Sequence, residues 1–158
     1  MSEAVATSND PIIQWVTFRL DHEKYGIKVM QVKEVLRMTE IAPVPGAPDY
    51  VLGIINLRGN VVTVIDLRSR FGLMSAEADD STRIVIIEAD NQTIGILVDS
   101  VAEVADIKSS DIDVAPNVGN DESSKYIQGV SSQGDELLIL VDVNKLLSEE
   151  EWSEMASI

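Results

Sequence analysis

The chain has 158 residues, 45% hydrophobic but only 4% aromatic, so it is long enough for one core, or two small ones, built mainly of Val, Ile and Leu. Its 27 acidic and 12 basic residues give a net charge of −15, which argues against nucleic acid or an anionic membrane surface as a partner. Without cysteine, disulfides and thiolate chemistry are excluded. Neither a signal sequence nor a run of about 18 apolar residues is present, so we expect a cytoplasmic protein without direct membrane binding.

The N-terminal third predicts a tail followed by a β-hairpin. Residues 1–11 are small and polar and end in Pro11, which is typical of a flexible tail. Residues 12–20 are β-branched and aromatic, and the turn DHEK leads into a second strand, YGIKV. The following MQVKEVLRM has apolar residues at helical spacing but is short enough for a strand, so both assignments stay open.

A second hairpin is predicted between Tyr50 and Gly72, in YVLGIINLRGNVVTVIDLRSRFG. Two apolar strands flank a turn at Arg58-Gly59-Asn60, and short turns are expected after Val29 and Asp66. Arg58 then lies at the hairpin tip. A lone arginine in a turn usually serves solubility, so the position alone does not indicate a function.

The second half of the chain repeats the first. Residues 83–107 parallel 14–38, and residues 126–147 parallel 50–71, with glycines and valines matched at constant offsets. A repeat of about 60 residues indicates duplication of one β module, and closed barrels remove the exposed edges of such short strands. We therefore expect an all-β protein of two packed five-stranded barrels.

The expected boundaries follow the two repeats. Subdomain one covers about 12–72, a polar linker about 73–82, and subdomain two about 83–147, within a domain of 12–147. Residues 144–158 predict a C-terminal helix and tail, with Leu146, Leu147 and Trp152 on its apolar face.

The chain is poor in reactive groups. His22, the only histidine, lies in a polar turn, and no glycine-rich phosphate-binding motif occurs. The acidic loop 108–124 lacks the EF-hand spacing, with Ala115 and Pro116 at positions that need Asp or Asn and Gly. We predict no catalytic residues, no metal and no cofactor. A hydrolase with paired carboxylates is disfavoured, because no pair falls at matched positions.

Several ordered motifs together resemble the CheW family of chemotaxis coupling proteins. They are YGIKVMQVKEV, INLRGNVVTVIDLRSRFG, LVDSVAEV and YIQGVSSQGDELLILVDVNKLL, spread from about Ile12 to Leu147. The resemblance implies two SH3-like barrels and a scaffold without catalysis. It also implies three kinds of partner: the cytoplasmic tips of chemoreceptors, the regulatory domain of the histidine kinase CheA, and other CheW-like domains in arrays. A regulatory segment of a kinase is the alternative, but no ATP-binding or phosphoacceptor sequence accompanies it.

The resemblance also implies contact residues. Receptor contacts are expected in a groove between the barrels, at Arg58, Val32, Ile94 and Val101. The kinase is expected to meet Glu34 and Val35, with Val32 pointing toward the groove and Glu34 and Val35 pointing away from it. Arg83 stands where a relative keeps an apolar residue just before a strand. Core packing is the competing explanation for the three apolar receptor contacts, because interior barrel residues look the same in sequence.

Overall fold

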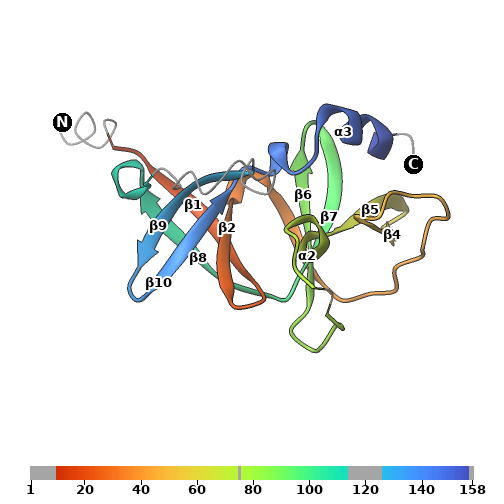
Figure 1. Ribbon diagram of the computed structural model, residues 1–158, viewed down its shortest axis with the longest axis horizontal. Helices are drawn as coiled ribbons and strands as arrows, with labels where there is room; N and C mark the ends of the chain where they lie inside the picture. The colour runs from red at the N-terminus through yellow and green to blue at the C-terminus, as the bar shows by residue number, and fades with distance from the viewer. Residues whose placement is uncertain (1–9, 75, 114–125, 157–158) are drawn as a thin grey trace.

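The computed structural model describes residues 10–74, 76–113 and 126–156, which form two five-stranded sheets and a few short helical segments (Figure 1). The first sheet has the order β8-β1-β2-β10-β9 and the second the order β3-β6-β7-β5-β4. This confirms the all-β prediction of two SH3-like barrels. Most of the predicted N-terminal tail and most of the loop 108–124 lie outside the described residues.

The strands of the first sheet are β1 (Ile12–Leu20), β2 (Glu23–Lys28), β8 (Ser100–Lys108), β9 (Ile127–Gln133) and β10 (Glu136–Val141). Those of the second sheet are β3 (Val32–Arg37), β4 (Val51–Leu57), β5 (Asn60–Asp66), β6 (Arg83–Ala89) and β7 (Gln92–Val98). The predicted hairpins β1–β2 and β4–β5 are confirmed. The ambiguous segment after Val29 is a 3₁₀ turn, η1 (Val29–Gln31), followed by strand β3.

The two sheets do not correspond to the two halves of the chain, so the predicted subdomains of 12–72 and 83–147 are wrong as units. The hairpin β1–β2 is completed by β8, β9 and β10 from the second half, and β6–β7 is completed by β3, β4 and β5 from the first. The exchange is held by two equivalent parallel pairings, of β10 with β2 and of β5 with β7. Because the repeats share one pattern, β3 fits beside β6 as β8 fits beside β1, and repeat similarity cannot distinguish exchanged from local pairing.

The exchange produces a core in three parts. Trp15, Leu138 and Leu140 belong to a cluster inside the first barrel, and Val64 and Ile84 belong to one inside the second. A larger central cluster takes buried residues from both sheets and from the C-terminal segment. We call it the central core; among its members are Phe18, Tyr25, Val85, Ile87, Ile94, Ile96, Tyr126, Leu146 and Trp152.

Strand β6 packs against two cores, one on each of its faces. Its residues Ile84 and Ile86 pack inside the second barrel, whereas Val85 and Ile87 pack in the central core. Side chains alternate between the two faces of a strand, so a strand buried on both faces is apolar at consecutive positions.

Short helical segments follow several of the strands. The predicted turn after Asp66 is helix α2 (Leu67–Arg70), capped by the Asp66 carboxylate, which accepts from the Arg68 amide. The predicted C-terminal helix is confirmed as α3 (Glu149–Ala156), but residues 143–145 form a separate 3₁₀ turn, η4 (Val143–Lys145). A further turn, η2 (Ser109–Asp111), follows β8.

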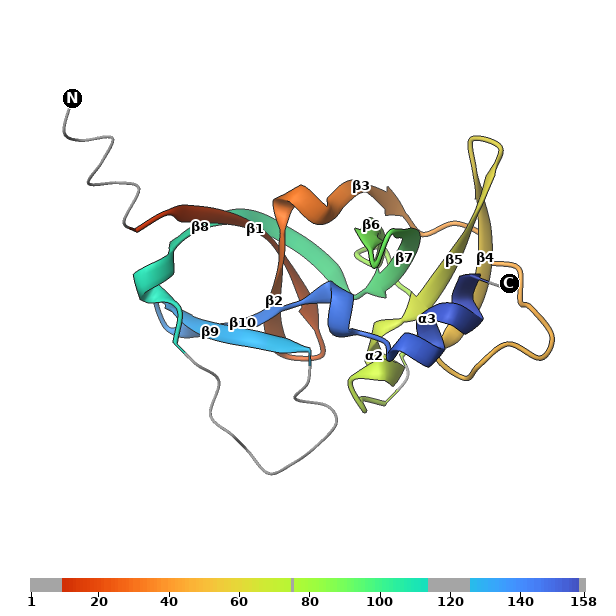
Figure 2. The same cartoon turned by 90° about the horizontal axis from the view of Figure 1, so that it is seen from above.

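Two arginines connect the short helices and the two barrels through ion pairs. Arg70 donates to the Glu151 carboxylate at 2.7 and 2.9 Å, which holds α3 against α2 (Figure 2). Arg68 donates to the two carboxylate oxygens of Asp99 at 2.8 and 2.5 Å, and one of these oxygens, Oδ2, also accepts from the Asp21 amide at 2.8 Å. Since Asp21 lies in the β1–β2 turn and Arg68 follows β5, this carboxylate links the two barrels. No helix in the described ranges is long and apolar enough to cross a bilayer.

Candidate functional site

Arg58 lies at the tip of the β4–β5 hairpin, as predicted, in a two-residue turn with Gly59. Both residues have positive φ, 51° for Arg58 and 88° for Gly59, and the Asn56 side chain accepts from the Gly59 amide at 2.9 Å. A positive φ at both central positions is typical of the turn that matches strand twist, but an arginine there is uncommon. The hairpin extends well beyond the body of the second barrel (Figure 2).

The Arg58 guanidinium is paired with Glu34 on β3. Two of its nitrogens donate to the two carboxylate oxygens, so the pair is bidentate. The Arg58 side chain remains 70% exposed and that of Glu34 29%. The hydrogen bonds from Arg58 lower the pKa of Glu34 below its usual range, so both groups stay charged at neutral pH. The sequence prediction had assigned these residues to different partners, and the structure brings them together.

Strand β3 presents two faces, and the predicted division of its residues between them is right for Glu34 and wrong for Val35. A bulge between Val32 and Glu34 shifts the register, so that Val32 lies opposite Ile87 and Val35 lies opposite Val85. Ile87 and Val85 both belong to the central core, and opposed residues share a face, so Val32 and Val35 lie on the central-core face. Glu34 lies on the other face, with Leu36. Glu34 therefore points away from Val32, as predicted, whereas Val35 shares the face of Val32.

Of the three apolar residues expected to contact a receptor, two remain accessible. Val32 and its repeat counterpart Val101, on β8, are partly buried and pack on the rim of the central core. Ile94 is only 1% exposed and lies within that core. Its assignment as a contact residue is therefore wrong, and core packing explains its apolar side chain. Val35 is 41% exposed.

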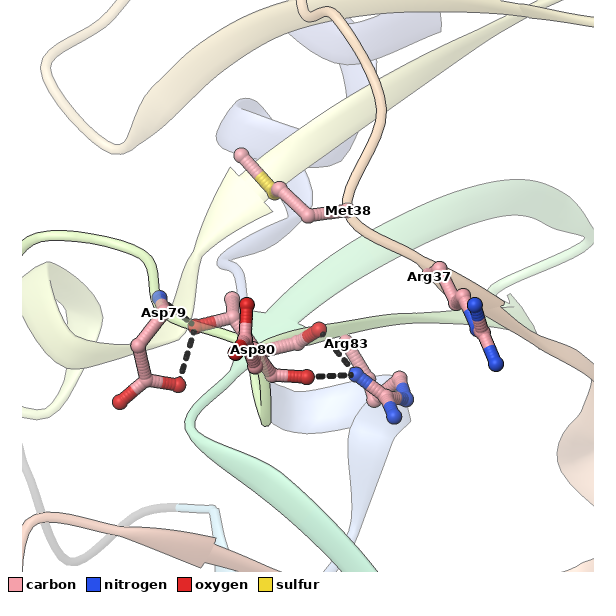
Figure 3. A pocket seen from close by; sticks show the side chains of 6 residues that line it. Arg37, Met38, Asp79, Asp80 and Arg83 are labelled. Atoms are coloured by element: carbon pink, nitrogen blue, oxygen red, sulfur yellow. Dashed lines mark hydrogen bonds between the residues drawn. The ribbon is translucent and has the colours of Figure 1, made fainter.

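A pair of arginines that the sequence reasoning did not assign lies at the end of β3. Arg37 and Arg83 face each other across the β3–β6 ladder and line a pocket of about 390 Å³ with Met38, Asp79, Asp80 and Thr82 (Figure 3). The signal in the sequence was Arg83, noted as a charge where an apolar residue was expected. Its partner Arg37 could be found only from the strand register.

The described part of the chain offers little to an enzymatic mechanism. His22 is exposed, as predicted. No group of three or more His, Cys, Asp or Glu side chains suited to a metal ion occurs among the described residues. The larger pocket, of about 1100 Å³, lies between α2, η4 and α3, where Arg70 is already paired with Glu151.

Comparisons with known proteins identify the family of the chain. Residues 14–151 match the family model for the CheW-like domain. The chain is 36% identical to the chemotaxis protein CheW of Treponema pallidum, over 95% of this chain and 91% of that protein. It is also 36% identical to the chemotaxis protein CheW of Bacillus subtilis, over 85% of this chain and 86% of the relative.

A solved structure gives the same result in three dimensions. The scaffolding protein TtCheW from Thermoanaerobacter tengcongensis superposes with a TM-score of 0.81 at 32% identity, over 89% of this chain and 96% of that one. The chain therefore belongs to the CheW family, the non-catalytic coupling proteins of chemotaxis signalling.

Proposed function

We propose that this protein couples the signalling tips of chemoreceptors to the histidine kinase CheA in the cytoplasm, and that two surfaces around strand β3 divide this work. The receptor surface consists of the Arg58–Glu34 pair with Val32 and Val101. The kinase surface begins at Val35, toward the end of β3. Other CheW-like domains in an array are further partners.

The observation that carries the receptor assignment is the geometry of Arg58. Its guanidinium is bidentate with Glu34 yet 70% exposed, so the side chain is held in place while part of its hydrogen-bonding capacity faces solvent. A receptor tip is an antiparallel helical hairpin. Its apolar residues would pack on Val32 and Val101, and the fixed guanidinium would set its orientation.

Glu34 belongs with this receptor surface rather than with the kinase. Both oxygens of its carboxylate accept from the Arg58 guanidinium. Changing Glu34 would release Arg58, so a charge reversal at Glu34 affects the receptor contact through its partner. This revises the sequence-based expectation that Glu34 and Val35 act together.

Titration with two purified probes tests the proposal: a receptor signalling fragment and the regulatory domain of the kinase. We expect the wild-type protein to bind each probe and to bind both at once. Glu34→Lys should weaken binding of the receptor fragment about tenfold or more, while Val35→Glu should weaken binding of the kinase domain and spare the receptor. A wild-type protein that binds neither probe would contradict the proposal.

A further inference from the structure

Arg37 and Arg83 form an unusual pair. They are directly opposed in the antiparallel β3–β6 ladder, and opposed residues point to the same face of a sheet. Like charges in this position destabilise a sheet, so the pairing is not explained by folding. In the described structure neither guanidinium forms an ion pair with a carboxylate, in contrast to the other four arginines.

The chain has six arginines, and in the described structure four of them form an ion pair with a carboxylate. These pairs are Arg19–Glu136, Arg58–Glu34, Arg68–Asp99 and Arg70–Glu151. The Arg37 side chain makes neither an ion pair nor a hydrogen bond with any described residue. One guanidinium nitrogen of Arg83 donates to the carbonyls of Asp80 and Thr82, at 2.8 and 2.9 Å. These hydrogen bonds hold the guanidinium in place and leave its other nitrogens available. In a chain of net charge −15, two adjacent arginines without a carboxylate partner are exceptional.

The surroundings indicate what kind of group these arginines bind. Figure 3 shows both guanidinium ends directed to the same side, with Asp79 on the other side of the pocket. The Asp79 carboxylate accepts from the Ser81 amide at 2.8 Å and so shapes its own turn. Two aspartates nevertheless offset the two arginines in net charge, which disfavours a small free anion. A carboxylate delivered by a protein gains apolar contact as well, since Met38 lines the pocket and is 39% exposed.

The arginine pair is continuous with the proposed kinase surface. Arg37 follows Val35 by two residues on the same face of β3, so the two side chains are neighbours along the strand. We infer that Arg37 and Arg83 bind a carboxylate side chain of the kinase regulatory domain, next to its apolar contact with Val35 and Met38. This inference rests on the proposed function. The partner is defined by its chemistry as an acidic residue beside an apolar one.

Charge reversal with a matched control tests the inference. The variant R37E/R83E is compared with K108E/K145E, which makes the same change in net charge at two exposed lysines outside β3 and β6. Binding of the kinase regulatory domain is measured at two salt concentrations. We expect R37E/R83E to weaken binding at least tenfold at low salt and to reduce its salt dependence, while the control changes it less than threefold. R37K/R83K keeps the charge but loses the planar fork, and should fall between wild type and R37E/R83E.

Three other outcomes would overturn the inference or the proposed function. Equal losses in R37E/R83E and the control would overturn the inference, because the effect would then be one of net charge. A loss confined to the receptor fragment would overturn it too, by assigning the arginines to the other partner. Failure of the wild-type protein to bind the kinase domain would overturn the proposed function itself, and is distinguished by the wild-type titration alone.

Discussion

The β4–β5 hairpin of the first repeat and the β9–β10 hairpin of the second both turn through two residues, but their tips differ in sequence and in surface. Arg58, with φ 51°, occupies the place that Gly134, with φ 63°, occupies in the other tip. Glycine adopts this conformation without steric cost, whereas arginine does not, so the first repeat departs from the residue that the turn favours. Equivalent glutamates differ likewise: Glu34 pairs with exposed Arg58, and Glu103 pairs with Lys24, which is only 8% exposed.

From this contrast we infer which positions of a duplicated protein build its fold and which bind its partners. Positions that are alike in both repeats build the fold, as at Gly53 and Gly129, or at the capping residues Asp66 and Asp142. Positions where one repeat departs from the other, such as Arg58, carry the contacts with partners.

The largest effect is expected at the matched glycines. A Cβ at Gly53 would overlap the carbonyl oxygen of Ala42, and one at Gly129 would come within 2.9 Å of the carbonyl oxygen of Asp113. Neither backbone segment can move without breaking its bridge to the neighbouring strand. We expect Gly53→Ala to lower the free energy of unfolding by about 3 kcal/mol or more, and Gly129→Ala by somewhat less, in urea titrations.

Gly134→Ala provides the control for this experiment. A Cβ there has open space around it, although φ is positive, so only a modest loss of about 1 kcal/mol is expected. A loss at Gly134 as large as that at Gly53 would contradict the distinction between crowding and turn conformation.

The carboxylate that links the two barrels should matter next most. Asp99 accepts from Arg68 and from the Asp21 amide. Asp99→Asn removes the nearer charged partner of the Arg68 guanidinium, which is 16% exposed, and leaves only the Asp21 carboxylate at 4.0 Å. We expect a loss of about 2 kcal/mol in unfolding free energy. Asp106→Asn, at an exposed carboxylate of β8, is the control and should change stability little. Equal losses of unfolding free energy in Asp99→Asn and Asp106→Asn would show that Asp99 does not stabilise the contact between the two barrels.

The same carboxylate predicts a pH dependence. Burial opposes ionisation of Asp99, but the hydrogen bonds from Arg68 and the Asp21 amide outweigh it and lower the pKa below the ordinary 3.8. A carboxyl group with a lowered pKa in the folded state stabilises above its ordinary pKa, and this contribution is lost as the pH falls toward the folded value. Thermal unfolding of wild type should therefore show stability falling below about pH 4, and Asp99→Asn should fall less steeply. If stability falls equally steeply with pH in wild type and in Asp99→Asn, Asp99 is not the source of the pH dependence.

The paired glutamates give a smaller and more selective effect. Glu103→Gln leaves nearly buried Lys24 without a carboxylate, and we expect a loss of about 1 kcal/mol in unfolding free energy. Glu34→Gln should leave the unfolding curve unchanged, because its pair with Arg58 is exposed, but should weaken receptor binding. Destabilisation by Glu34→Gln equal to that by Glu103→Gln would show that the repeats use this position alike.

The limits of sequence reasoning follow the same line. Alternating apolar residues and turn chemistry predicted the hairpins β1–β2 and β4–β5, because these depend on neighbours in the chain. The exchange of β3 and β8 could not be predicted, since the two repeats offer equivalent partners. Val35 was placed on the wrong face of β3, because the bulge between Val32 and Glu34 shifts the register of the strand. Ile94 was indistinguishable from a surface contact until the central core was known.

Arg58→Gly tests the central claim most directly, because it replaces the first repeat's tip residue with the second's and removes only the side chain that departs from the repeat. Calorimetric titration of this variant and wild type against a receptor signalling fragment, with the kinase domain as a parallel titration, measures the consequence. We predict receptor affinity about tenfold weaker and kinase affinity unchanged, with no loss of unfolding free energy, because glycine relieves the steric cost of the positive φ. Unchanged receptor affinity would contradict the account and leave Arg58 as a solubilising residue in a turn.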